Sequence, residues 1–213
     1  MDFDQFLNAV SKIENIPLPA ETSQFKMSPP FRLKLQEMQK DKIKEAKQAG
    51  VMALFYPNTN YETTLVLILR KTDKGVHSAQ VGFPGGKLED QDLSIEKAAL
   101  RETYEEVGVP IENIEVLKKM TQVYIPPSNF FVQPFIGISQ ITPKFIKQDD
   151  EVEDIIEVAL TDLLSDNNII MERVSTSYKV NVDVPAFKLN NHVVWGATAM
   201  MLSEVKDLLK EML

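Results

Sequence analysis

Apolar residues recur at helical spacing near both ends of the chain. The first such pattern covers residues 2–15 and predicts an amphipathic helix. A second helix is predicted over Leu35–Ala46, ending at Gly50, and a last one from Trp195 to about Met212. Prolines break the chain between the first two helices into an extended connector: Pro17, Pro19, Pro29 and Pro30.

Short apolar runs in the middle of the chain predict strands instead. Val51–Tyr56 and Thr64–Leu69 flank the turn-rich segment Pro57–Asn60, which indicates a hairpin. The second run has little polar alternation, so we expect a central strand covered on both faces. Further strands are predicted at Ile114–Ile125, Phe131–Ile138, Ile155–Leu160, Ile169–Val174 and Val182–Leu189, with one helical turn at Thr161–Ser165.

One helix follows a Pro-Gly-Gly turn and carries an unusual set of acidic residues. Ser94 is the expected N-cap, and Gly108 followed by Pro110 is the expected stop. On a helical wheel with Ile95 at zero, the apolar residues cover an arc from zero to roughly 140°. Glu106 lies at about 20° and Glu102 at about 340°, whereas Glu105 lies near 280°.

Two carboxylates at the edge of a buried stripe need a counter-charge, because desolvating an unpaired carboxylate costs several kcal/mol. A Mg²⁺ or Mn²⁺ ion supplies that charge, takes oxygen ligands and can be shared with substrate phosphates. The plain alternative is a solvated acidic face in which Arg101 pairs with Glu105 at i,i+4.

Composition narrows the class of protein. The chain has 213 residues, a net charge of −8, 44% hydrophobic residues and no cysteine. The length fits one embellished domain, and the negative charge argues against a general nucleic-acid binder. No apolar run approaches the ~18 residues of a membrane span, and the acidic N-terminus lacks a signal pattern. We therefore expect a cytoplasmic protein whose partner is a small molecule, with neither a membrane nor a nucleic acid as partner.

The segment RETYEEVGV, Arg101 to Val109, resembles the REUxEExGU half of the Nudix box GX5EX7REUxEExGU. Three departures stand out: one extra residue lies between Gly86 and Arg101, Asp92 replaces the expected Glu, and Thr103 replaces the first aliphatic residue. An extra residue with Asp at that point resembles the branch of the family that hydrolyses coenzyme A.

That branch also carries an upstream motif, LLTxRSx3Rx3Gx3FPGG. Val66, Leu67, Arg70 and Phe83-Pro84-Gly85-Gly86 match it. The sequence departs from the motif at four positions, Ile68, Lys71, Gly75 and Ala79, where the motif has Thr, Ser, Arg and Gly. The strings YIPPSNF and WGATA also resemble the branch, so the resemblance covers most of residues 50–210.

The resemblance implies an α/β fold of Nudix type, an α/β/α sandwich with a mixed sheet and helices on both faces. We expect residues 1–48 to form an N-terminal helical extension and residues 49–213 the Nudix domain. The implied activity is metal-dependent hydrolysis of a diphosphate linked to a nucleoside. Coenzyme A or acyl-coenzyme A is the leading substrate, giving 3′,5′-ADP and (acyl-)phosphopantetheine.

Site residues follow on the matched positions. The Gly86 carbonyl and three carboxylates are expected to hold the cations: Glu102, Glu105 and Glu106. Glu102 or Glu151 is expected to orient or deprotonate the attacking water. Glu151 belongs to an acidic stretch whose alternative interpretation is a solvated loop. Arg101 is expected to orient acidic groups. Substrate contacts are expected from Arg70, His77, Gln80, Phe83, Gly85 and Lys87.

Alternatives remain open. His77 and Gln80 fit a structural role in the loop, and Lys87 fits a solvated surface position. The substrate is alternatively ADP-ribose, a dinucleotide or a nucleoside triphosphate. A different class of protein, a nucleotide-binding regulatory module without catalysis, is also compatible with the scaffold, although three clustered glutamates favour an enzyme.

Overall fold

The strands form two sheets in the part of the chain that this computed structural model describes, residues 1–71, 80–175 and 181–213. The larger sheet has the order β3-β2-β1-β7-β5, with β4 beside β1, β6 beside β7 and β8 beside β2. Its strands are β1 (Lys47–Pro57), β2 (Thr63–Arg70), β3 (Val81–Gly82), β4 (Gly85–Lys87), β5 (Glu115–Lys119), β6 (Val123–Ile125), β7 (Phe130–Ile138) and β8 (Val152–Ala159). The smaller sheet, in the order β11-β10-β9, holds β9 (Ile169–Ser175), β10 (Asn181–Leu189) and β11 (His192–Trp195).

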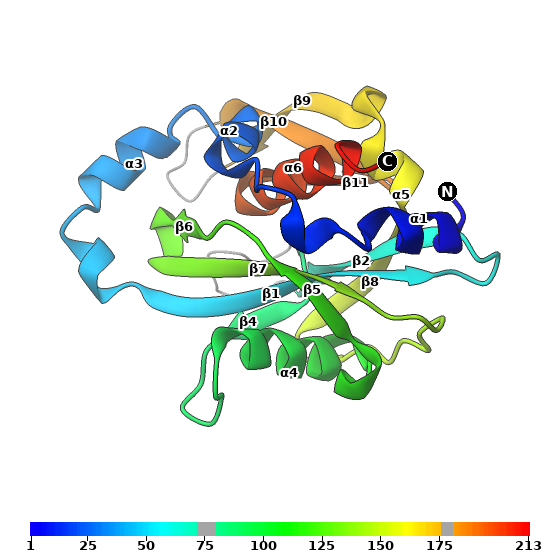
Figure 1. Cartoon of the computed structure of the whole chain (residues 1–213). Coiled ribbons are helices and arrows are strands. Elements are labelled where there is room, and N and C mark those ends of the chain that lie inside the picture. The colour runs from blue at the N-terminus through cyan, green and yellow to red at the C-terminus, as the bar shows by residue number, and fades with distance from the viewer. Residues whose placement is uncertain (72–79, 176–180) are drawn as a thin grey trace.

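Helices cover both faces of the larger sheet (Figure 1). One face carries α4 (Ile95–Val107), and the other carries α1 (Phe3–Val10), α2 (Ala20–Gln24) and α6 (Gly196–Lys210). The smaller sheet lies on the same side as α6. Two further α-helices are α3 (Arg32–Met38) and α5 (Leu160–Leu164), and short 3₁₀ turns occur at Ile13–Asn15, Phe25–Met27, Lys42–Glu45, Ile111–Asn113, Pro126–Ser128 and Asp166–Asn168.

The central strands bury both of their faces. Ala53 and Phe55 of β1 belong to the core beneath α1 and α6, whereas Met52 and Leu54 belong to the core beneath α4. Successive side chains of a strand point to opposite faces, which explains the alternation. Since β1 pairs in parallel with β7 and antiparallel with β2, the sheet is mixed. The predicted α/β sandwich is therefore confirmed.

The N-terminal helices share a core with the C-terminal one. Phe3 and Phe6 of α1 are fully buried in the same cluster as the apolar side chains of α6, and the Phe6 ring lies 5.2 Å from that of Phe55. Polar contacts reinforce this packing: the Gln24 side-chain amide donates to the buried Glu204 carboxylate at 2.9 Å. The division into an extension of residues 1–48 and a domain of residues 49–213 stays a prediction.

The predicted helix over Leu35–Ala46 is wrong in its extent. Only α3 and a 3₁₀ turn form there, because Lys47 already starts β1 by donating its amide to the Asn129 carbonyl. Gly50 ends no helix. It lies inside β1, where a Cβ would approach the Ile95 carbonyl oxygen to 2.3 Å, so glycine lets α4 lie close against the strand.

Two other segments differ from expectation. The single strand predicted over Ile114–Ile125 is two strands, β5 and β6, that pair with different parts of β7. The short strand β11 was not predicted, and neither was a separate small sheet. None of the helices in the described ranges is both long and apolar enough to cross a lipid bilayer.

Candidate active site

The helix α4 has the predicted ends. The Ser94 hydroxyl accepts the Lys97 amide at 3.2 Å, and Gly108 closes the helix with a φ of +76°. A left-handed φ is easy for glycine because it has no Cβ. These two caps fix which residues of α4 turn toward the sheet.

The three glutamates of α4 differ in burial. The side chain of Glu106 is 1% exposed, that of Glu102 is 14% exposed and that of Glu105 is 49% exposed. This is the order in which the helical wheel placed them relative to the apolar stripe. Glu106 and Glu102 therefore lie at the sheet, and Glu105 lies at the solvent side of the helix.

The Pro-Gly-Gly turn brings the backbone against these carboxylates. A Cβ on Gly86 would lie 2.2 Å from the carboxyl carbon of Glu102, and a Cβ on Gly85 would lie 2.4 Å from the Gly50 carbonyl oxygen. Gly85 also has a φ of +147°, a region that favours glycine. Its amide donates to Glu106 Oε2 at 2.7 Å. Gly85 is therefore required by the backbone, whereas a larger residue at Gly86 would displace the Glu102 carboxylate.

Arg70, the last residue of β2, joins the same turn to the same helix. Its Nη2 donates to the Gly85 carbonyl at 2.7 Å, and its Nη1 lies 3.1 Å from Glu106 Oε1. The second contact is an ion pair without hydrogen-bond geometry, since Glu106 Oε1 is a buried oxygen with no hydrogen bond. Arg70 thus contacts both the buried carboxylate of Glu106 and the glycine that donates to it.

Arg101 contacts the other acidic groups of the site. Its guanidinium bonds both carboxylate oxygens of Asp92 at 3.0 and 2.9 Å and donates to the Lys87 carbonyl at 3.1 Å. Its Nη1 reaches Glu102 at 3.1 Å and Glu105 at 2.9 Å. This forked pairing raises the pKa of Arg101 and lowers that of Asp92. The orienting role expected for Arg101 stays a prediction.

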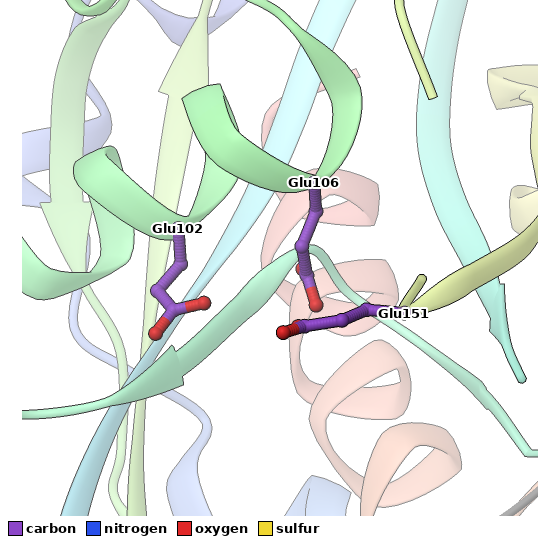
Figure 2. A group of neighbouring side chains, drawn as sticks. All are labelled: Glu102, Glu106 and Glu151. Carbon is purple, nitrogen blue, oxygen red and sulfur yellow. The ribbon is translucent and has the colours of Figure 1, made fainter. Parts of the chain in front are cut away.

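Glu151 completes an acidic group with Glu102 and Glu106 (Figure 2). One carboxylate oxygen of each lies within 4.8 Å of the others, and the three side chains point toward a common space. Glu151 comes just before β8, which pairs with β2, and its carbonyl accepts the Lys71 amide at 2.9 Å. Strand pairing thus brings Glu151 to α4.

The donor set fits a hard divalent cation. Mg²⁺ and Mn²⁺ take carboxylate and carbonyl oxygens, and the group offers three carboxylates beside a glycine turn. The unbonded, buried Glu106 Oε1 is the oxygen that most needs such a partner. Glu105 lies outside the group, bound to Arg101, so its role as a metal ligand stays a prediction, as does that of the Gly86 carbonyl.

Burial disturbs the titration of this group. Desolvation raises the pKa of Glu106 from its ordinary value of 4.5 to about 7, although the Arg70 charge and the Gly85 amide act in the opposite direction. Desolvation also raises the pKa of Glu102, with Arg101 opposing it. Burial and neighbouring like charges are the physical causes of such raised pKa values, which occur frequently at functional sites.

The remaining predicted residues are spread around the turn. His77 lies outside the described residues. Gln80 accepts the Arg70 amide through its carbonyl at 3.1 Å, Phe83 is buried in the core at 2% exposure, and the Lys87 side chain is exposed. Their roles as substrate contacts stay predictions.

Two pairings were not predicted from the sequence. Asp92, noted only as a departure from the motif, anchors Arg101 through both carboxylate oxygens, and its side chain is 4% exposed. Arg70 pairs with Glu106 across the turn. The only sequence signal for the first was an acidic residue in the motif's Glu position. No local signal indicated the second, because β2 and α4 are separated along the chain.

Comparisons with known proteins identify the family of this chain. The NUDIX domain family model matches residues 46–176. A Nudix hydrolase NudL of Pectobacterium atrosepticum, described as uncharacterized, is 30% identical over 172 residues, covering 76% of this chain and 83% of that protein. A NudL of Yersinia pestis, with the same description, is 31% identical over 144 residues, covering 66% of this chain and 70% of that protein.

Among solved structures, a MutT/nudix family protein from Enterococcus faecalis superposes with a TM-score of 0.49 at 19% identity, covering 78% of this chain and 62% of that one. The family match spans more than half of the chain and includes the Pro-Gly-Gly turn, α4 and Glu151. The predicted enzyme class is thereby confirmed: this chain belongs to the Nudix family and is a hydrolase of nucleoside diphosphate-linked compounds.

Proposed function

We propose that this enzyme cleaves the diphosphate of coenzyme A or of an acyl-coenzyme A, giving 3′,5′-ADP and (acyl-)phosphopantetheine, with Mg²⁺ or Mn²⁺ as cofactor. One observation carries the proposal. The two halves of the motif that resembles the coenzyme A branch, the end of β2 and the Pro-Gly-Gly turn, contact each other and the acidic group through Arg70. These two described parts of the motif therefore lie against the acidic group, which supports the proposal.

The acidic group supports metal-assisted hydrolysis. Glu102, Glu106 and Glu151 would hold the cation, and Glu105 and the Gly86 carbonyl are the further ligands expected from the sequence. A divalent cation bound there would neutralise the diphosphate and lower the pKa of a water. Either Glu102 or Glu151 would orient that water or take its proton, and their place in the acidic group supports this role.

Arg101 acts on these carboxylates as a positioning residue. It holds Glu102 with one nitrogen while Asp92 fixes the rest of the guanidinium. A carboxylate held in this way keeps one orientation, which favours proton transfer in a fixed geometry.

The proposed substrate preference rests on the basic residues at and just after the end of β2, Arg70 and Lys71. Arg70 contacts Glu106, and the Lys71 amide donates to the carbonyl of Glu151. The backbone of both residues therefore lies close to the acidic group. Gly75, where the motif has Arg, lies outside the described residues. A 3′-phosphate bound by one cation or two amides is worth about 1.5–3 kcal/mol, roughly 10- to 150-fold in kcat/KM.

The test compares kcat/KM for coenzyme A, dephospho-coenzyme A, ADP-ribose, a dinucleotide and a nucleoside triphosphate in Mg²⁺ and in Mn²⁺. We expect coenzyme A to be the best substrate, with a modest preference over its dephospho form because Gly75 offers no charge. Dephospho-coenzyme A lacks only the 3′-phosphate, so the ratio isolates that group. Equal kcat/KM values for coenzyme A and dephospho-coenzyme A would show that the enzyme does not recognise the 3′-phosphate.

Two other results would change the assignment. Faster cleavage of ADP-ribose, a dinucleotide or a nucleoside triphosphate would replace coenzyme A as substrate and leave the Nudix chemistry intact. Tight nucleotide binding without turnover in either metal would indicate a regulatory binding module.

A further inference from the structure

Arg70, Gly85 and Glu106 form a closed ring of contacts. The Gly85 amide donates a hydrogen bond to Glu106 Oε2, and the Gly85 carbonyl accepts one from Arg70 Nη2. Arg70 Nη1 forms an ion pair with the other carboxylate oxygen, Glu106 Oε1. The ring links β2, the Pro-Gly-Gly turn and α4 at the edge of the acidic group. Its members are held by short contacts of 2.7, 2.7 and 3.1 Å.

The two arginines of the site form ion pairs with different acidic side chains. Arg101 pairs with Asp92, Glu102 and Glu105. Within the described residues, the ion pair of Glu106 is with Arg70. Glu106 is also the most buried of these carboxylates, and a buried ionised carboxylate without a neighbouring cation is strongly destabilising.

We propose that Arg70 is the internal counter-cation of this site and competes with the divalent metal for Glu106. In the metal-free protein the guanidinium neutralises Glu106. If Glu106 held a divalent cation, the charge of Arg70 would no longer be needed there, and two cations beside one carboxylate would repel each other. This inference rests on the metal site of the proposed function.

The geometry allows Arg70 to give up Glu106 without leaving the site. Its Nη2 bond to the Gly85 carbonyl at 2.7 Å does not involve the carboxylate, so the guanidinium stays anchored. The side chain is 32% exposed, and its Nη1 contact to Glu106 is the one that lacks hydrogen-bond geometry. A released Nη1 would be available to an anionic group of the substrate, in agreement with the contact predicted for Arg70.

Competition between Arg70 and the metal for Glu106 predicts a different effect on metal binding than a purely structural role of Arg70. Two cations that exclude each other from one carboxylate are coupled negatively, and the coupling is reciprocal. Removing the charge of Arg70 must then destabilise the metal-free protein and tighten metal binding at the same time. A residue that only shapes the site would weaken metal binding when it is lost.

The experiment measures Mg²⁺ binding by isothermal titration calorimetry to the full chain and three variants. The titrations are run at about pH 9, so that protons compete little with Mg²⁺ for the carboxylates. Arg70→Met removes the charge, and Arg70→Lys keeps it. Arg173→Met is the matched control, because Arg173 forms an exposed ion pair with Asp183 in the smaller sheet.

We expect Arg70→Met to bind Mg²⁺ about three- to tenfold more tightly than the wild type, and Arg70→Lys to stay within about twofold. Arg173→Met should match the wild type. Saturating Mg²⁺ should also raise the melting temperature of Arg70→Met by roughly 2–4 °C more than it raises that of the wild type.

Several results would overturn the inference. Equal or weaker Mg²⁺ binding by Arg70→Met, with normal binding by the wild type, would refute the competition and leave the proposed metal site standing. Failure of Arg70→Met to fold even in saturating Mg²⁺ would also refute it, since the metal should then neutralise Glu106. Absence of Mg²⁺ binding by the wild type would refute the metal site itself and this inference with it.

Discussion

Replacing Glu106 by glutamine should stabilise the metal-free protein while abolishing its turnover. Glutamine keeps the size of the side chain and an oxygen that can accept the Gly85 amide. It removes a negative charge that is 1% exposed and lies among two other carboxylates. The change therefore isolates the cost of holding a buried charge in the absence of its cation.

The magnitude follows from the pKa of Glu106. Its rise from 4.5 to about 7 means that ionising Glu106 costs more in the folded protein than in the unfolded chain. At about 1.4 kcal/mol per pKa unit the difference is about 3 kcal/mol of unfolding free energy. This figure already contains the stabilising effects of Arg70 and Gly85, because both lower the same pKa.

The sign gives a pH dependence. Because the folded-state pKa is raised, the folded wild type binds the proton more tightly than the unfolded chain. The corresponding stability is fully present below pH 4.5 and is lost as the pH rises through about 7. Glu106→Gln cannot ionise, so its advantage over the wild type should be smallest near pH 4.5 and should reach about 3 kcal/mol near pH 8.

Urea denaturation in EDTA at pH 5 and pH 8, for wild type and Glu106→Gln, measures this difference. Comparing the two pH values cancels any pH-independent effect of the amide. Glu105→Gln is the control, since that side chain is 49% exposed and should change stability by less than about 0.5 kcal/mol. An advantage of Glu106→Gln that is the same at both pH values, or absent at pH 8, would refute the reasoning.

The remaining predictions concern the chemistry, the turn and the core. Glu102→Gln should lower kcat by about 100-fold or more in saturating Mg²⁺, measured as nucleotide release; near wild-type activity would remove Glu102 from the machinery. Gly86→Ala should weaken Mg²⁺ binding at least about tenfold by calorimetry, because its Cβ would lie 2.2 Å from the Glu102 carboxyl carbon; unchanged affinity would mean that the turn moves freely. Phe6→Ala should cost about 3–5 kcal/mol of unfolding free energy in urea, since Phe6 is 0% exposed; a cost below about 1 kcal/mol would show that α1 is not part of the core.

The sequence determined the local features of the site. Helical periodicity alone ordered Glu106, Glu102 and Glu105 by burial, because the spacing of 3.6 residues per turn places side chains relative to an apolar stripe without knowledge of the fold. The caps Ser94 and Gly108 were predictable for the same reason. Each of these signals lies within a few residues of the feature that it predicts.

Sequence reasoning failed where a segment depends on its neighbours. The lysine-rich stretch before Lys47 has helical spacing, yet the chain from Lys47 onward forms β1 and pairs with β7. The α-helix in this region is therefore limited to α3. Gly50 reads as a helix stop but is required by the close approach of α4. Pairing over many residues outweighs local propensity in both cases.

The acidic group itself needed the tertiary structure. Glu151 was a candidate among several acidic residues, and only the antiparallel pairing of β2 with β8 brings its carboxylate within 4.8 Å of those of Glu102 and Glu106. The ion pair of Arg70 with Glu106 arises in the same way, from a strand end and a helix that meet across the Pro-Gly-Gly turn. Such contacts are set by sheet order and register, which residue spacing does not encode, and so they appear only once the chain is folded.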